Sequence, residues 1–103
     1  MKITYEVTAV VAPELSGRFE EYMISRHISD VLATGHFESA TFSRDSNGRY
    51  RMRYVAGSRE SLDSYLAEHT QRLRADFHEH FPMGIELSRD EWDVIAAFNG
   101  GVD

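Results

Sequence analysis

The chain has 103 residues, and its 17 acidic side chains outnumber its 11 lysines and arginines, so the formal net charge is -6. This length predicts a single domain over residues 1–103. The acidic balance argues against DNA or RNA as a partner, because phosphate binding requires a basic surface. Since there is no cysteine, disulfides and thiolate chemistry are excluded. No apolar run reaches the roughly 20 residues that span a bilayer, and no signal-peptide pattern opens the chain, so we expect a cytoplasmic protein without membrane contact.

The first segment predicts a strand followed by a helix. Residues 2–11 alternate between apolar and polar side chains, which is typical of a strand with its odd-numbered side chains on a core. Pro13 suits a first helical turn, because its missing N–H would be unpaired there in any case. An amphipathic stripe then continues to Leu32. We expect the helix to end at Gly35, since glycine readily adopts the left-handed conformation that terminates helices.

The middle of the chain predicts a hairpin and a second helix. Two segments rich in β-branched and aromatic residues, 37–43 and 50–56, flank the sequence Asp-Ser-Asn-Gly at 45–48. Asn-Gly accepts positive φ without strain, so this sequence favours a hairpin connection. Ser58 is a good N-cap for a second helix, and five turns of helical spacing follow it until Pro82 ends the pattern.

The last segment begins as a fourth strand and then leaves two alternatives open. Residues 83–87 alternate, but beyond Arg89 the apolar side chains change phase. Either the strand continues with its other face now apolar, or a short helix starts at Ser88, where Ser-Arg-Asp-Glu matches a capping box. We favour the strand extension, and we expect residues 100–103 to be a frayed end.

This order of elements predicts an α+β fold. With right-handed crossovers, strand–helix–strand–strand–helix–strand most simply forms a ferredoxin-like βαββαβ sandwich. Its antiparallel sheet has the spatial order 4-1-3-2, and both helices cover one face. The other face is mixed in composition, so it is either solvated or half of a two-fold interface. We favour a homodimer through this helix-free sheet face, a dimeric α/β barrel whose two sheets enclose a cavity.

Three residues of the helix-free face are candidates for ligand binding. Glu6 from the first strand meets Arg51 or Arg53 from the third, because these strands are neighbours in the predicted sheet. Within a barrel this group could bind a small polar or anionic molecule. The alternative is that the three side chains only pair with one another or across the dimer axis. Thr34, at the end of the first helix, is assigned to the same ligand-binding role.

His27 and Asp30 are the candidates for catalysis. They lie three residues apart, so their side chains share one face of a helix. A carboxylate can orient an imidazole and stabilise its charged form, as a general base requires. The alternative is that both side chains only stabilise the end of the helix.

The other histidines do not predict a metal site. His69 and His80 lie 11 residues apart on one helix, about 16 Å along its axis, and cannot share an ion. Asp76 and His80 lack an evident third ligand, although His27, Asp30 and His36 could converge around the turn at the helix end. We therefore predict no metal and no cofactor.

Two segments resemble a known family. Residues 27–37, His-Ile-Ser-Asp-Val-Leu-Ala-Thr-Gly-His-Phe, combine a histidine, an aspartate and Thr-Gly-x-Phe at fixed spacing, and residues 58–69 read Ser-Arg-Glu-Ser-Leu-Asp-Ser-Tyr-Leu-Ala-Glu-His. Together they are similar to a family of short bacterial proteins classed as a domain of unknown function. The resemblance implies a ferredoxin-like fold related to the dimeric α/β-barrel group, and it implies no particular reaction. That wider group includes cofactor-independent monooxygenases, small isomerases and lyases, heme-binding enzymes and ligand binders.

Two hypotheses of different class follow. The first is a non-enzymatic homodimer that binds a small molecule or a protein partner. The second is a cofactor-independent monooxygenase or isomerase that uses His27 as a base with Asp30 behind it. The enzyme requires a pocket beside His27 that also contains Arg53 or another polar strand residue. Heme binding is a third alternative.

Overall fold

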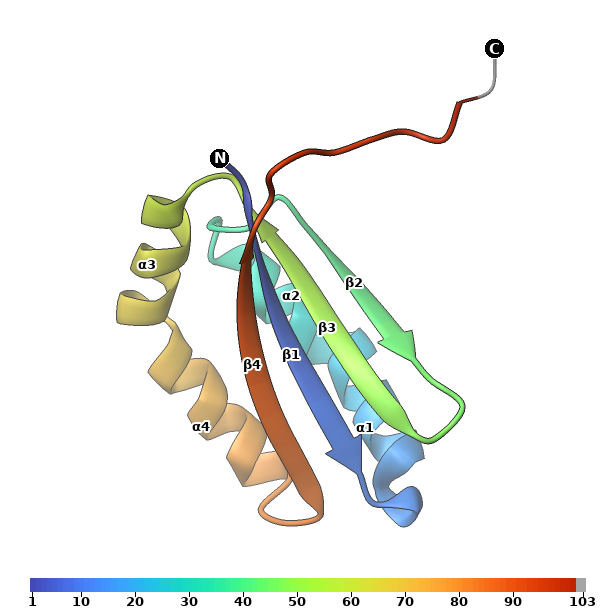
Figure 1. Cartoon of the computed structure of the whole chain (residues 1–103). Helices are drawn as coiled ribbons and strands as arrows, with labels where there is room; N and C mark the ends of the chain where they lie inside the picture. Colours follow the sequence, from blue (N-terminus) through green and yellow to red (C-terminus); the bar gives the residue numbers. More distant parts are fainter. Residues whose placement is uncertain (102–103) are drawn as a thin grey trace.

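A computed structural model describes residues 1–101 and shows one sheet with helices on one side (Figure 1). Residues 102 and 103, the last part of the expected frayed end, lie outside the described residues. The strands are β1 (Ile3–Val11), β2 (Ser39–Arg44), β3 (Arg49–Ala56) and β4 (Ile85–Asp93). The helical segments are η1 (Pro13–Leu15), α1 (Ser16–Tyr22), η2 (Met23–His27), α2 (Ile28–Ala33), α3 (Arg59–Glu68) and α4 (Thr70–His80).

The sheet has the predicted topology. Its order is β2-β3-β1-β4, and every pair of neighbours is antiparallel. The ferredoxin-like α+β sandwich expected from the sequence is thereby confirmed. The Asp45–Gly48 hairpin is also confirmed: Gly48 has φ +81°, and the Asp45 carboxylate accepts hydrogen bonds from the backbone N–H groups of Asn47 and Arg49.

The first helical unit runs without a break from η1 to α2, but one of its turns is widened. Residues 23–27 form a π-helical segment, which the sequence pattern did not predict. The buried stripe passes through it, from Phe19 through Met23 to Val31. The unit ends as expected at Gly35, which has φ +82°. The π turn carries His27 at its C-terminal end, on the same element that packs over the sheet.

The second helical unit was predicted as one continuous helix, and this prediction is wrong. His69 has φ -123° and separates α3 from α4. Each half still contributes its share of the predicted apolar stripe, Leu62 and Tyr65 from α3 and Leu73 and Phe77 from α4. The apolar spacing therefore survives across the break. The Ser58 N-cap is confirmed, because its Oγ accepts a hydrogen bond from the backbone N–H of Ser61.

The core lies between the helices and one face of the sheet. The odd-numbered residues of β1 and the Tyr50, Met52 and Tyr54 side chains of β3 are buried on this face, as the alternation predicted. Phe19 and Phe77 of the helices contact each other among them, with ring centroids 6.2 Å apart. Aromatic rings account for much of this layer.

The fourth strand continues to Asp93, so the strand extension is confirmed and the alternative helix from Ser88 is wrong. The reason is pairing: β4 is hydrogen-bonded to β1 along its whole length, from Ile85 opposite Val11 to Asp93 opposite Ile3. Beyond it the chain leaves the sheet and extends away from the molecule (Figure 1). Within residues 1–101, every helix is too short or too polar to cross a membrane.

Candidate functional site

A cavity of about 40 Å³ lies between the sheet and the helices. Its space corresponds to about three water molecules. Tyr5 and Tyr54 line it from the sheet, and His27 and Phe77 line it from the helices. Its remaining lining residues are mostly apolar: Val7, Met23, Val31, Met52, Leu73 and Leu87, together with Tyr65, Arg74, His78 and Arg89.

Three of the residues that line this cavity are tyrosines. Tyr5, Tyr54 and Tyr65 are all buried, and the rings of Tyr54 and Tyr65 lie 6.3 and 6.2 Å from that of Tyr5. Arg74 donates a hydrogen bond of 3.2 Å from Nη2 to the hydroxyl of Tyr5. Burial raises the pKa of Tyr65 to about 12 and raises the pKa of Tyr54 as well. The phenols of Tyr54 and Tyr65 are therefore protonated at neutral pH and available as hydrogen-bond donors or acceptors.

His27 is a titratable group in the cavity wall, and burial affects its charge state. Its ring is stacked on Tyr22 at 5.7 Å and lies edge-on to Phe77 at 5.8 Å. Burial lowers its pKa, and the charges of Asp30 and Asp76 only partly oppose this effect. Its Nδ1 is buried and has no hydrogen-bond partner among residues 1–101. The imidazole is thus neutral at pH 7 and can accept a proton or a hydrogen bond.

The structure places Asp30 apart from the cavity. Its carboxylate is exposed and faces Arg26, with Oδ2 3.9 Å from Nε. Asp30 instead lines a separate surface hollow together with Thr34 and His69. The Thr34 hydroxyl donates a hydrogen bond of 2.7 Å to the carbonyl of Val31, so it caps the end of α2.

The ligand-binding candidates of the sheet lie together on its helix-free face. Glu6 and Arg53 are opposite each other in the β1–β3 pair, and Oε2 lies 3.7 Å from Nε. Glu6 and Arg51 line a shallow hollow of about 440 Å³ on this face, between β1 and the β2–β3 hairpin. The sheet itself separates this hollow from the cavity beside His27. The predicted residues therefore fall into three places rather than one: the cavity, the hollow beside Thr34 and the open face.

Sequence reasoning missed the cavity's own residues. It assigned Tyr5 and Tyr54 to the core, which is where they are, but gave them no further role. It did not single out Arg74 or Arg89. The available signal was their position: Arg89 is opposite Val7 in the β1–β4 pair, so it faces the helices from an edge strand. Both arginines lie close enough to Tyr65 for their charges to act on its pKa.

Comparison with protein families decides the relationship that the two sequence segments suggested. A family model described as a domain of unknown function, DUF4286, matches residues 2–95. The chain belongs to the DUF4286 family. No curated protein matches this DUF4286 chain in sequence.

Solved structures resemble the DUF4286 chain in fold. A variant of SnoaB, a cofactor-independent oxygenase from Streptomyces nogalater, has a TM-score of 0.75 at 13% identity and covers 96% of this chain and 98% of its own. A dimeric ferredoxin-like protein from an uncultured marine organism has a TM-score of 0.74 at 16% identity, with 94% and 98% covered. The ActVA-Orf6 monooxygenase of Streptomyces coelicolor, in complex with nanaomycin D, has a TM-score of 0.69 at 13% identity, with 97% and 92% covered. At these identities the likeness is one of fold.

Proposed function

We propose that this DUF4286 protein is a homodimer that binds a small aromatic acid or phenolate in the cavity beside His27. The observation that carries the proposal is that one cavity combines an aromatic interior with a basic mouth. The mouth is formed by Arg74, His78 and Arg89. Tyr5, Tyr54 and Phe77 supply aromatic rings to the cavity wall. Arg74 and Arg89 line the same cavity and make no ion pair with the carboxylates of residues 1–101.

The charges of the mouth favour an anion. The chain as a whole is acidic, yet the exposed side chains that line this cavity are His78 and Arg89, and Arg74 is half-buried beside them. Guanidinium groups without a carboxylate partner are suited to hold a carboxylate or phenolate oxygen. An aromatic ring attached to that anion then packs among the tyrosines.

The size of the cavity limits the occupant. A space of about 40 Å³ accepts part of a ligand without rearrangement. A single-ring compound needs the flexible side chains of the mouth, Arg89 and His78, to move outward. Both are exposed, so their movement disturbs little core packing.

A titration with 4-hydroxybenzoate tests this proposal. We expect saturable binding by calorimetry to the wild-type protein, and at least tenfold weaker binding to Arg74→Gln. The matched control is Arg51→Gln, which removes a guanidinium from the helix-free face and should leave binding unchanged. Benzamide, a neutral analogue, should bind at least tenfold more weakly than the acid. Equal binding to the two variants, or no binding to the wild type, would contradict the proposal.

A second candidate is cofactor-independent oxygenase or isomerase chemistry at His27. The specific observation in its favour is the neutral, partly buried imidazole, whose buried Nδ1 lacks a hydrogen-bond partner among residues 1–101. Such a base can take the proton of a bound phenol and leave an electron-rich phenolate. The fold supports this candidate by analogy, because SnoaB and ActVA-Orf6 carry oxygenase descriptions. Tyr5 and Tyr54, rather than Arg53, are the polar strand residues beside His27.

Oxygen uptake distinguishes the two candidates. With hydroquinone as the probe and no added metal or cofactor, an oxygenase should consume oxygen faster than the uncatalysed reaction. His27→Gln should lower that rate at least tenfold, whereas Asp30→Asn should have a small effect because Asp30 lies outside the cavity. Absence of catalysed uptake by the wild type would rule out oxygenation of this probe and leave the binding proposal standing.

The homodimer is supported by the apolar side chains of the helix-free face and the C-terminal segment. Val10 and Trp92 are exposed on this face, and beyond β4 the side chains of Ile95 and Phe98 are 91% and 90% exposed. Val10 and Trp92 lie toward opposite ends of this face, next to Glu86 and Thr4 respectively, so a partner that covers the sheet would bury both side chains. One solved structure of the same fold is described as dimeric.

We further propose that residues 27–37 are the segment by which members of this family can be recognised.

A further inference from the structure

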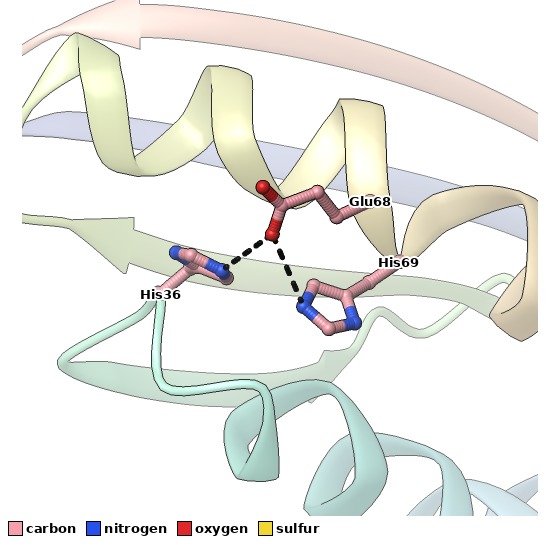
Figure 2. A group of neighbouring side chains, drawn as sticks. All are labelled: His36, Glu68 and His69. Carbon is pink, nitrogen blue, oxygen red and sulfur yellow. Dashed lines mark ion pairs between the residues drawn. The ribbon is translucent and has the colours of Figure 1, made fainter.

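We propose that His36, Glu68 and His69 form a site for a divalent transition-metal ion, with Zn²⁺ as the ion that fits best. This site is independent of the cavity and of the function proposed for it. Figure 2 shows the three side chains turned toward one another from two different parts of the fold. One ligand atom from each residue lies within 4.8 Å of the other two.

Two backbone features bring the ligands together. His36 follows Gly35, whose φ of +82° ends the first helical unit and turns the chain toward β2. Glu68 is the last residue of α3, and His69 occupies the break before α4. In a continuous helix, adjacent side chains point about 100° apart and do not face one ligand together. The non-helical backbone of His69 changes its direction relative to Glu68, and both then reach the same point.

The distances are close to those of a metal site without its ion. Oε2 of Glu68 lies 3.9 Å from Nε2 of His36 and 3.9 Å from Nε2 of His69. Tetrahedral zinc with ligand bonds of about 2.0–2.2 Å places neighbouring ligand atoms about 3.4 Å apart. The two Glu68 distances reach this value with a contraction of about half an ångström. The ligand atoms of the two histidines lie within 4.8 Å of each other, and they must also approach by rotation of the side chains.

The burial of the ligands also suits a bound ion. The side chains of His36 and His69 are 23% and 26% exposed, so their rings are held by packing while an outer side stays open to water. The two ring centroids are 5.3 Å apart, and the ring planes are tilted by 48° to each other. Two imidazoles and one carboxylate leave a fourth position for water, a ligand set that zinc accepts.

The donor atoms select the class of metal. Imidazole nitrogen favours Zn²⁺, Cu²⁺ and Ni²⁺ over Mg²⁺ and Ca²⁺, which prefer oxygen ligands. The positive charge of Arg72 opposes the binding of a cation here, because its Nη2 lies 3.4 Å from Nδ1 of His69. An ion on Nε2 requires a proton on Nδ1, so the Arg72 side chain must turn away when the ion binds. Arg72 is exposed and free to do so. Removing its charge should therefore strengthen binding.

A calorimetric zinc titration of the wild-type protein tests the site. We expect one ion per chain, binding at least tenfold weaker in His36→Gln and Glu68→Gln, and tighter binding in Arg72→Gln. His80→Gln is the matched control, because His80 lies beside Asp76 in a different two-residue cluster. Glu68 is exposed, so Glu68→Gln keeps the fold even if a histidine variant does not, and circular dichroism checks each variant. Co²⁺ should give the visible absorption of a tetrahedral nitrogen and oxygen site, and Mg²⁺ should not compete.

Two results would overturn the assignment. One is the lack of saturable zinc binding by the wild type. The other is binding that His36→Gln and Glu68→Gln leave unchanged while His80→Gln abolishes it, which would place the ion at the Asp76–His80 pair. Neither result bears on the cavity, because the zinc ligands are not among its lining residues.

Discussion

At the scale of single residues, the burial of a side chain determines its chemistry more than the identity of its sequence neighbours does. His27 and Asp30 lie three positions apart, but their environments differ. The imidazole is partly buried against Tyr22 and Phe77, while the carboxylate is exposed beside Arg26. Burial, rather than a charged partner, therefore sets the proton affinity of His27. An imidazole in this setting resists protonation instead of being stabilised in its charged form.

The pH dependence of stability follows from this burial. In the unfolded chain His27 takes up a proton below about pH 6.5, whereas the folded state holds its pKa lower and delays that uptake. Stability is therefore lost as the pH falls through this window, and it is retained above it. His27→Gln removes the titration, so its free energy of unfolding should fall less between about pH 7.5 and about pH 5.5. Urea unfolding at both pH values measures this difference. The exposed control His78→Gln should behave as the wild type does, and an equal slope in His27→Gln would contradict the argument.

At the scale of elements, local signals placed the ends of helices and strands well, and they failed inside helices. The Ser58 cap and the Asp45–Gly48 turn are formed by residues next to one another in sequence, so both were predictable. The π turn at residues 23–27 and the break at His69 had no comparable local signature. Both irregularities carry residues that the proposed sites use, His27 in the π turn and His69 at the break.

The cap of α3 gives a prediction at this scale. Ser58→Ala removes the side-chain acceptor that lies 3.1 Å from the backbone N–H of Ser61. We expect the free energy of unfolding to fall by about 1 kcal/mol, as for other N-cap serines. The control Ser29→Ala changes an exposed serine inside α2 and should stay within about 0.5 kcal/mol of the wild type. Chemical denaturation measures both variants. Equal stability of the two would show that the cap contributes nothing.

At the scale of the whole molecule, the two faces of the sheet differ in what covers them. The helices cover one face and enclose the cavity, while the other face presents the Glu6–Arg53 pair together with exposed Val10 and Trp92. In a monomer, the mixed face of such a sheet is covered by water alone. The exposed apolar side chains on this face favour a second copy of the chain as its cover.

The molecular mass of the protein in solution tests whether it forms the homodimer. Light scattering at micromolar concentration should give about twice the chain mass of 11.8 kDa. Val10→Asp places a charge on the helix-free face and should shift the protein toward monomer. The matched control is Ile24→Asp, which changes an exposed apolar residue of the helical layer and should leave the mass unchanged. A wild-type monomer, or a dimer that only Ile24→Asp disrupts, would contradict an interface through the sheet.

The sequence by itself determined the elements and their order in the sheet. Alternation along residues 2–11, the Asn-Gly turn, the serine cap and the spacing of apolar residues are local patterns, and with the handedness of crossovers they leave few topologies. They also placed Glu6 opposite an arginine, because arginine recurs at every second position of 49–53, so any register that keeps these side chains on the helix-free face brings one of them near Glu6.

Only the tertiary structure decided which distant residues meet. Tyr5 and Tyr65, or His36 and His69, are brought together by how far each helix lies along the sheet and by the irregular turns within the helices. No pattern in neighbouring residues encodes those offsets, since they result from the packing of side chains across the whole core. The cavity, its basic mouth and the cluster around Glu68 therefore came from the packed structure, and the fold came from the sequence.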